Sequence, residues 1–268
     1  MNIKGKTVLV TGASSGMGAG IARAMAEAGG KLVLLGRRLD ALQRVANEIT
    51  RVGGESHIYT IDLADAKAVM NVATRIKTEV GVPDVIVNNA GSGKWLFVDE
   101  TSPDEAVQMM TVPYFAAFYV TRAFLPEMLK RNSGHIVNIS SCGSRFVWPG
   151  ATAYLAARWA IRGFTEALRA DLYNTRIGVT LYESGVVESP YWDHNPGSRE
   201  RVPKMGMLIP PLNTDQVGKA VVHGVEGNKR LVVIPFMMRM TYLQHAVVPW
   251  LVQWLMTVTG YRRPQVRG

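Results

Sequence analysis

The chain has 268 residues and a formal net charge of +9, with 30 lysines and arginines against 21 aspartates and glutamates. Its single cysteine, Cys142, excludes an intrachain disulfide, and the absence of a basic run with interleaved aromatic residues argues against a nucleic-acid partner. Because we find no Pro/Ser-rich linker, no low-complexity tract and no apolar signal region before residue 7, we expect one domain in the cytoplasm.

A glycine-rich loop, TGASSGMG (11–18), lies between a predicted strand (7–10) and a predicted helix that ends near Gly29. Glycines allow the backbone to turn tightly and approach a diphosphate, and a helix N-terminus offers free N–H groups and a partial positive charge. A glycine-rich turn without a ligand is the alternative, and the flanking strand and helix make it less favoured. The candidate nucleotide contacts are Gly12, Ser14, Ser15, Gly16, Met17 and Gly18.

A second predicted strand, 31–35, runs into Gly36, Arg37 and Arg38. An acidic residue at this point of a dinucleotide fold would accept hydrogen bonds from the adenosine ribose, whereas glycine and arginines make room for a 2′-phosphate and attract it. Two solvated arginines at a strand end are the alternative, and Gly36 favours the phosphate. We therefore expect NADP(H), with Arg37 and Arg38 as contacts.

Small and amide residues follow a further predicted strand, 84–87. The segment Asn88-Asn89-Ala90-Gly91 would stand at the carboxyl end of that strand, where open α/β sheets bind ligands. By itself this tetrapeptide is equally consistent with a turn. As part of a site, Asn89, Ala90 and Gly91 would contact the nucleoside.

Together with Ser141 and Tyr154, these motifs resemble the classical short-chain dehydrogenase/reductase family over residues 6–235. The resemblance implies a single α/β domain, a Rossmann-type doubly wound parallel sheet of about seven strands with helices on both faces. It also implies a homodimer or homotetramer formed through the helix 151–173 and its predecessor. Further matches are Thr11, the structural NNAG at 88–91, and the adenine-contacting position at Asp62 and Leu63.

In this family a tyrosine and a serine act on the carbonyl oxygen that gains a proton when hydride is transferred. The resemblance therefore assigns proton transfer to Tyr154 and polarisation of the carbonyl to Ser141. Because an unperturbed tyrosine has a pKa of about 10, a nearby cation is needed to stabilise tyrosinate. The family uses a lysine four residues later, which also holds the nicotinamide ribose, and here that position is Arg158.

Two positions depart from the family pattern. Arg158 keeps a positive charge and several donors, but its planar group is larger than an ammonium and differently aimed. Pro113 occupies the place of a helix asparagine that anchors a water in the proton relay, and proline offers neither an amide side chain nor an N–H. We expect Pro113 to distort the helix in the asparagine's place.

The segment after the predicted strand 177–182 would meet the nicotinamide. The resemblance assigns this contact to Gly185, Val187 and Ser189, with the Ser189 hydroxyl replacing a threonine. Glu183 is an unusual charge here, and we expect it either to pair with Arg158 or to take part in catalysis.

The substrate pocket is expected to lie between residues 92–98, the loop after Ser141 and a mobile lid within 189–215. Aromatic residues in these segments favour a bulky hydrophobic substrate. They are Trp95, Phe146, Trp148, Tyr191 and Trp192.

An apolar and basic extension, 236–268, follows the predicted NADP(H)-binding domain (1–235, including the lid). Its apolar core is too short to span a bilayer. Trp250 and Trp254 with flanking arginines are typical of an interfacial anchor on the cytoplasmic membrane face. An extension that packs over the substrate cleft or against a subunit is the equal alternative.

The sequence as a whole predicts an oxidoreductase that transfers hydride between NADP(H) and the carbonyl or hydroxyl group of a hydrophobic, lipid- or steroid-like substrate. The alternative is an NADP(H)-binding relative with little turnover, serving as a sensor or partner subunit. No metal site is expected.

Overall fold

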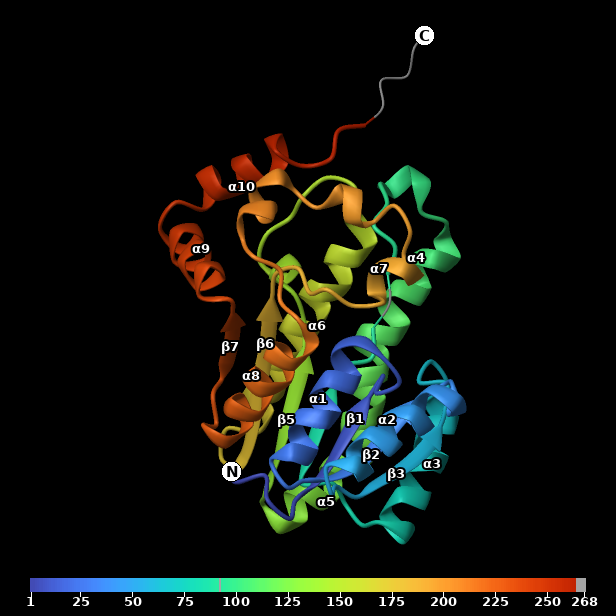
Figure 1. The fold of residues 1–268 in the computed structure, drawn as a ribbon. Coiled ribbons are helices and arrows are strands. Elements are labelled where there is room, and N and C mark those ends of the chain that lie inside the picture. The colour runs from blue at the N-terminus through green and yellow to red at the C-terminus, as the bar shows by residue number, and fades with distance from the viewer. Residues whose placement is uncertain (92, 264–268) are drawn as a thin grey trace.

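Seven parallel strands form one sheet in the computed structural model, which describes residues 1–91 and 93–263 (Figure 1). Their spatial order is β3-β2-β1-β4-β5-β6-β7. The strands are β1 (Thr7–Thr11), β2 (Lys31–Gly36), β3 (Ser56–Thr60), β4 (Val85–Asn88), β5 (Gly134–Ile139), β6 (Ile177–Ser184) and β7 (Leu231–Ile234). Strands that alternate with helices pair in parallel through crossover connections. The predicted doubly wound parallel sheet is therefore confirmed.

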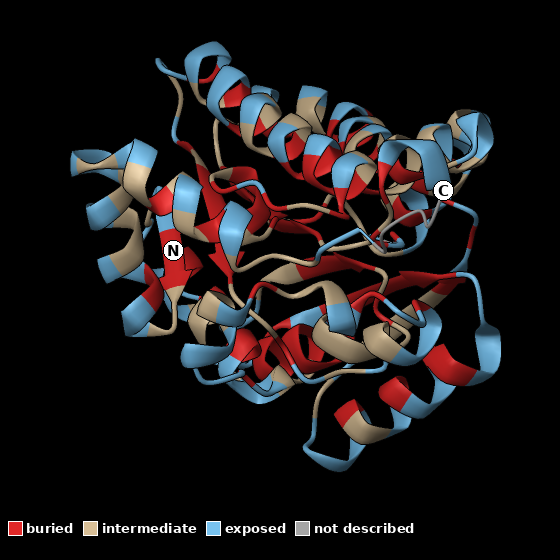
Figure 2. Cartoon of the chain, turned by 90° about the horizontal axis from the view of Figure 1, so that it is seen from above, coloured by how far each residue is buried: buried red, intermediate tan, exposed pale blue. Residues whose placement is uncertain are grey.

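Helices cover both faces of the sheet, and Figure 2 shows the buried strands between the two helix layers. One layer consists of α1 (Gly16–Glu27), α2 (Leu39–Arg51) and α8 (Thr214–Glu226). The other consists of α3 (Ala66–Glu79), α5 (Ala116–Arg131) and α6 (Thr152–Asp171). Both strand faces are buried because each layer presents an apolar stripe to the sheet.

The order of the strands reverses at β1, which pairs with β2 on one side and with β4 on the other. At such a point the two following loops leave in opposite directions and open a crevice at the carboxyl ends of the strands. The glycine loop after β1 and the NNAG segment after β4 meet there. The topology thus brings the two predicted nucleotide motifs together.

Further helices lie beyond the carboxyl ends of the strands, at the top of Figure 1. They are α7 (Tyr191–His194), α9 (Phe236–Val247) and α10 (Pro249–Val258), with the 3-10 turns η1 (Val98–Glu100), η3 (Cys142–Ser144), η4 (Arg199–Arg201) and η5 (Lys204–Leu208). The predicted lid contains α7, η4 and η5, and α9 and α10 belong to the predicted extension, whose residues 264–268 lie outside the described residues. Within the described residues, no helix combines the length and the apolar character needed to cross a membrane.

A π-helical turn, η2 (Thr111–Phe115), joins α4 (Pro103–Met110) to α5, and Pro113 lies within it. Proline cannot donate the backbone hydrogen bond of an α-helix, and a π turn absorbs such a missing donor. The N–H of Ala116 donates to the Thr111 carbonyl, five residues back. The expected distortion at Pro113 is present, while its equivalence to the family's asparagine stays a prediction.

His135 of β5 is buried against β6. Its Nε2 lies 2.8 Å from Oγ1 of Thr180, whose hydroxyl donates to the Lys229 carbonyl, so Nε2 carries the proton of a neutral ring. Burial, with a smaller effect of the N-terminal charge, lowers the pKa of His135 from 6.5 to about 4. The unfolded chain binds a proton below pH 6.5 that the folded chain does not accept until about pH 4. The stability from this group is therefore complete above pH 6.5 and is lost as the pH falls.

We expect the free energy of unfolding to fall by about 3 kcal/mol through this group as the pH drops across that window. His135→Gln should flatten the decline, because glutamine cannot titrate. His194→Gln, on the exposed surface of α7, is the matched control and should leave it unchanged. Urea unfolding at a series of pH values measures both variants. A decline as steep in His135→Gln as in the parent would assign the acid sensitivity to other groups.

Candidate active site

The glycine loop and the NNAG segment are joined by hydrogen bonds at the ends of β1 and β4. The Thr11 hydroxyl oxygen accepts the backbone N–H groups of Asn89 and Ala90, each at 2.9 Å, and the Asn89 amide donates to the Thr11 carbonyl at 2.9 Å. A Cβ at Gly18 would lie 2.1 Å from the carbonyl oxygen of Gly12, so only glycine fits between loop and helix. Gly12, Gly18 and Ala90 do not line the nucleotide cleft. They allow the segments that form it to pack closely against each other.

A cleft of about 550 Å³ lies over the start of α1 and the end of β2. The predicted nucleotide residues in its lining are Ser14, Ser15, Gly16, Arg38 and Ser189. Free N–H groups and the dipole at the start of α1 favour an anion in this cleft.

Arginine charges are distributed unequally around this cleft. Arg23 and Arg44 line it but are paired with carboxylates at 2.8 and 3.2 Å, respectively. Arg38 lines it and has no ion-pair partner in the described part of the chain. Arg37 is exposed and is not among the lining residues, so of the two predicted arginines only Arg38 faces the cleft.

Asp62 and Leu63 follow β3 and lie outside the lining of this cleft. Leu63 is buried in the core, and the exposed carboxylate of Asp62 accepts the N–H of Ala64 at 3.0 Å. Their adenine contact stays a prediction.

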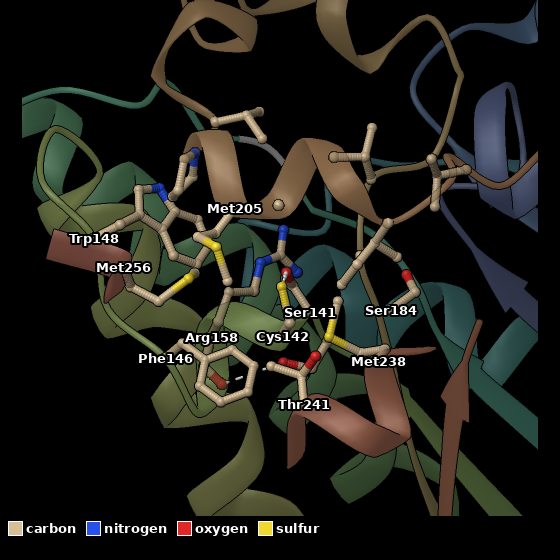
Figure 3. A pocket seen from close by; sticks show the side chains of 18 of the residues that line it. Ser141, Cys142, Phe146, Trp148, Arg158, Ser184, Met205, Met238, Thr241 and Met256 are labelled. Carbon is tan, nitrogen blue, oxygen red and sulfur yellow. Dashed lines mark hydrogen bonds between the residues drawn. The ribbon is translucent and has the colours of Figure 1, made fainter. Parts of the chain in front are cut away.

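A second cavity, of about 470 Å³, adjoins the cleft through Ser189, which lines both. The three predicted catalytic residues, Ser141, Tyr154 and Arg158, line it together, and Figure 3 shows Ser141 and Arg158 in its wall. The same lining holds predicted cofactor contacts from the ends of three strands, namely Met17, Asn89, Gly91, Gly185 and Val187. The fold therefore places the hydroxyl and cationic groups beside the nucleotide residues.

Arg158 lies beside the tyrosine four residues before it on α6, as the spacing predicts. Its guanidinium carbon is 4.8 Å from the centre of the Tyr154 ring, and both side chains are 7% exposed. Its Nε is buried and finds no hydrogen-bond partner among residues 1–91 and 93–263. A Cβ at Gly91 would lie 3.2 Å from its Nη2, so this glycine leaves the space that the larger arginine needs.

Ser141 is the N-cap of η3, and its hydroxyl oxygen accepts the N–H of Gly143 at 3.2 Å. Its proton points to a weak acceptor, the sulfur of Cys142 at 3.8 Å, and is therefore available to a better acceptor such as a carbonyl oxygen. Burial raises the pKa of the Cys142 thiol to about 11. The thiol thus stays protonated near neutral pH, in keeping with an unreactive cysteine.

Glu183 does not pair with Arg158, and that expectation is wrong. Strand β6 continues to Ser184, beyond the predicted end, because Glu183 and Ser184 pair with β7. Glu183 is therefore fully buried within the strand, where it accepts the Nε–H of Arg145 at 2.8 Å and the hydroxyl of Ser144. The positive charge of Arg145, on the loop that follows Ser141, therefore balances the negative charge of Glu183.

The C-terminal helices hold the same loop from the other side. The Arg145 guanidinium lies 4.7 Å from the Tyr242 ring of α9. Gln253 of α10 donates to the Val147 carbonyl at 2.8 Å and accepts the Val147 N–H at 3.3 Å. The extension therefore packs over the inner cavity, in agreement with the predicted arrangement over the substrate site, and contributes to the position of the serine loop.

The predicted aromatic residues Trp95, Trp148, Tyr191 and Trp192 all line the cavity. The Trp95 ring centre lies 5.1 Å from those of Trp148 and Tyr154. The Tyr191 hydroxyl accepts the indole N–H of Trp95 at 3.0 Å and donates to the Gly93 carbonyl at 2.7 Å, and burial raises the pKa of Tyr191. Ser92, also predicted to line the pocket, lies outside the described residues.

Sequence reasoning missed the sulfur-containing part of the lining. Met205 from the lid, Met238 from α9 and Met256 from α10 converge with Cys142 in the cavity (Figure 3). The methionine-rich composition of the extension was the only signal of this role, and it did not show which methionines face the cavity. Methionine is flexible and fills irregular apolar space, so this wall can adapt to different shapes.

Comparisons with known proteins agree with this fold. The family model described as short chain dehydrogenase matches residues 6–198. An uncharacterized oxidoreductase of Mycobacterium tuberculosis is 36% identical over 193 residues, which cover 70% of this chain and 57% of that relative. The chain thus matches less than two thirds of the relative's length.

Solved structures cover more of the chain. A short-chain dehydrogenase from Streptomyces avermitilis has a TM-score of 0.79 at 26% identity, with 94% of this chain and 97% of that chain covered. A metagenomic short-chain oxidoreductase in complex with NADP has a TM-score of 0.72 at 30% identity, with 87% and 98% covered.

Proposed function

Because the chain belongs to the short-chain dehydrogenase/reductase family, we propose that it is an NADP(H)-dependent oxidoreductase. It transfers hydride between NADP(H) and the carbonyl or hydroxyl group of a hydrophobic substrate, such as a lipid- or steroid-like ketone or aldehyde. One observation carries the proposal: Ser141, Tyr154 and Arg158 share a cavity with the nucleotide residues of three strand ends.

The residues of the two cavities fit NADP(H). The Oδ1 of Asn89 and the Nε of Arg158 are buried without partners in the described part of the chain, and both residues line the inner cavity. Arg38 and the start of α1 suit phosphate groups in the outer cleft. Bound there, NADP(H) supplies the nicotinamide ring that gives or accepts the hydride. A bound NADP in the metagenomic structure supports the choice of cofactor.

The protein's own groups handle the proton and the orientation of the substrate. In the direction of reduction, Tyr154 donates its hydroxyl proton to the carbonyl oxygen, and Ser141 donates a second hydrogen bond to the same oxygen. The cation of Arg158 stabilises the tyrosinate left behind. In the reverse direction Tyr154 accepts the proton of the alcohol.

The lining of the inner cavity supports a hydrophobic substrate. Aromatic rings from Trp95, Trp148 and Trp192 and methionines from the lid and from α9 and α10 line the wall beyond the catalytic residues. Apolar walls with a few convergent polar groups are typical of sites that bind an apolar body and orient one polar group.

Spectrophotometry with the purified protein tests the proposal. We expect NADPH to bind and its absorbance at the nicotinamide band to fall when hydrophobic ketones or aldehydes are added. Tight NADPH binding without turnover across a broad panel would replace this function by the binding-only alternative. Failure to bind either nicotinamide cofactor would refute both.

Arg38 is expected to set the preference between the two cofactors. Arg38→Ala should weaken NADPH binding by about 10- to 100-fold through loss of a charge-assisted hydrogen bond, and leave NADH binding nearly unchanged. Arg37→Ala is the matched control and should change the ratio much less, because its side chain does not line the cleft. Fluorescence titration with each cofactor gives the two dissociation constants. An equal loss for NADPH and NADH would show that Arg38 supports the fold and not the 2′-phosphate.

A further inference from the structure

The two C-terminal helices expose apolar stripes to solvent. On α9 the exposed stripe is Phe236, Met240, Leu243 and Val247, and on α10 it is Trp250, Trp254 and Val258. The opposite sides of the same helices bury Met238, Val252 and Met256. Spacings of three and four residues place each stripe on one helix face. A water-soluble surface seldom exposes this many large apolar side chains together, so the stripes indicate a binding surface.

This surface continues into the substrate cavity. Phe236, Met240 and Leu208 line the cavity and are nevertheless 70%, 44% and 67% exposed. They belong to α9 and to η5, which is tied to the end of α10 by a hydrogen bond from the Lys204 N–H to the Thr259 carbonyl at 3.0 Å. The cavity therefore opens where the exposed apolar residues of α9 and η5 are.

The two helices and the segment after them carry charges of one sign. Residues 236–263 contain no aspartate or glutamate. Arg239 and Arg262 are exposed and have no ion-pair partner in the described part of the chain, whereas Arg263 is paired with Asp99 of η1 at 2.7 Å. An anionic lipid surface complements this distribution, because arginines meet the headgroups while tryptophans enter the interfacial region. A second copy of the chain complements it poorly, because a twofold interface would face these arginines with those of the partner.

We propose that α9, α10 and η5 form a docking surface for an anionic lipid membrane, and, resting on the proposed function, that the substrate enters the cavity directly from that membrane. The substrate class is then a lipid-soluble alcohol, ketone or aldehyde that partitions into bilayers. Docking places the apolar rim of the cavity in the interface, so the substrate does not have to cross water.

Vesicle sedimentation tests the docking surface without cofactor or substrate. At low ionic strength we expect the chain to bind phosphatidylcholine vesicles that contain about one third phosphatidylserine at least about tenfold more tightly than pure phosphatidylcholine vesicles. Trp250→Ser/Trp254→Ser should weaken that binding by about tenfold or more. The matched control, Trp159→Ser, removes a tryptophan that is 47% exposed on α6 and should bind as the parent does.

The charge is tested separately with Arg239→Glu/Arg262→Glu, which changes no apolar residue and should also weaken the binding. NADPH titration and thermal unfolding show that each variant is folded. Parent protein that binds neither kind of vesicle, or tryptophan and arginine variants that bind like the parent, would overturn the proposal. A dimer that forms with increasing concentration and is broken by the tryptophan variant would assign the surface to a second copy instead.

Entry of the substrate from the membrane is tested by comparing reduction rates for two kinds of substrate. With a ketone dissolved in water, the tryptophan variant should reduce it at the parent rate, whereas with a long-chain ketone embedded in anionic vesicles its rate should fall by about tenfold, in line with its binding. Loss of both rates would point to damage in the active site. Absence of all turnover together with intact vesicle binding would refute the proposed function and leave the docking surface standing.

Discussion

Tyr154→Phe is expected to lower the rate of NADPH-dependent carbonyl reduction by about 10²- to 10⁴-fold, which is the usual contribution of a positioned proton donor. The ring keeps its contacts with Trp95 and with the Arg158 guanidinium, because these involve the aromatic face and not the hydroxyl. NADPH affinity should therefore change little. Single-turnover measurements at saturating NADPH separate the chemical step from binding.

Tyr191→Phe is the matched control for this experiment, since it removes a tyrosine hydroxyl from the same cavity. That hydroxyl bonds to Trp95 and Gly93 and has no proposed part in proton transfer. Its loss should reduce the rate by less than about tenfold, by loosening the pocket wall. Comparable rates for Tyr154→Phe and the parent protein would contradict the assignment of Tyr154 as the proton donor.

Arg145→Met is expected to lower the free energy of unfolding by about 3–5 kcal/mol, because it leaves the carboxylate of Glu183 buried without its cation. For a chain of this size that loss corresponds to a fall in Tm of about 10 °C. The buried ion pair itself contributes little net stability, and the effect comes from the charge that remains. Thermal and urea unfolding of the full chain measure it.

The double variant Arg145→Met/Glu183→Gln is the control for this explanation. Glutamine removes the stranded charge and can still accept the hydroxyl of Ser144, so at least half of the lost stability should return. The single variant Glu183→Gln should cost less than Arg145→Met, since the remaining arginine is partly exposed and can reach water. A double variant less stable than Arg145→Met would show that the two residues do not act as a pair.

The sequence alone determined the fold class and located the two motifs that meet at the ends of β1 and β4. Strand, turn and helix signals around 11–18 are local, and the glycines there are required by backbone geometry that nearly any relative of this fold shares. The same holds for residues 88–91. Their hydrogen bonds to Thr11 join segments far apart in the chain, but both motifs were identifiable before that contact was known.

The resemblance predicted a catalytic role for Ser141, Tyr154 and Arg158, and the structure brings these three residues into one cavity. The partners of the charged residues were not predictable. Glu183 and Arg158 are close to the same site in the predicted topology, yet Glu183 meets Arg145, because β6 runs two residues further than its apolar pattern indicated. Likewise Arg37 and Arg38 have the same local chemistry, and only the start of α2 at Leu39 directs Arg38 and not Arg37 toward the cleft.

The extension shows most clearly which features follow from the sequence and which depend on the tertiary structure. Its composition, with tryptophans, methionines and arginines and no acidic residue, already indicated an apolar surface with positive charge, because composition is a property of the sequence. Which side chains face the cavity and which face outward depended on where α9 and α10 pack against the serine loop and β7. That packing is decided by contacts between residues distant in the chain, such as Gln253 with Val147 and Tyr242 with Arg145, and local patterns carry no record of them.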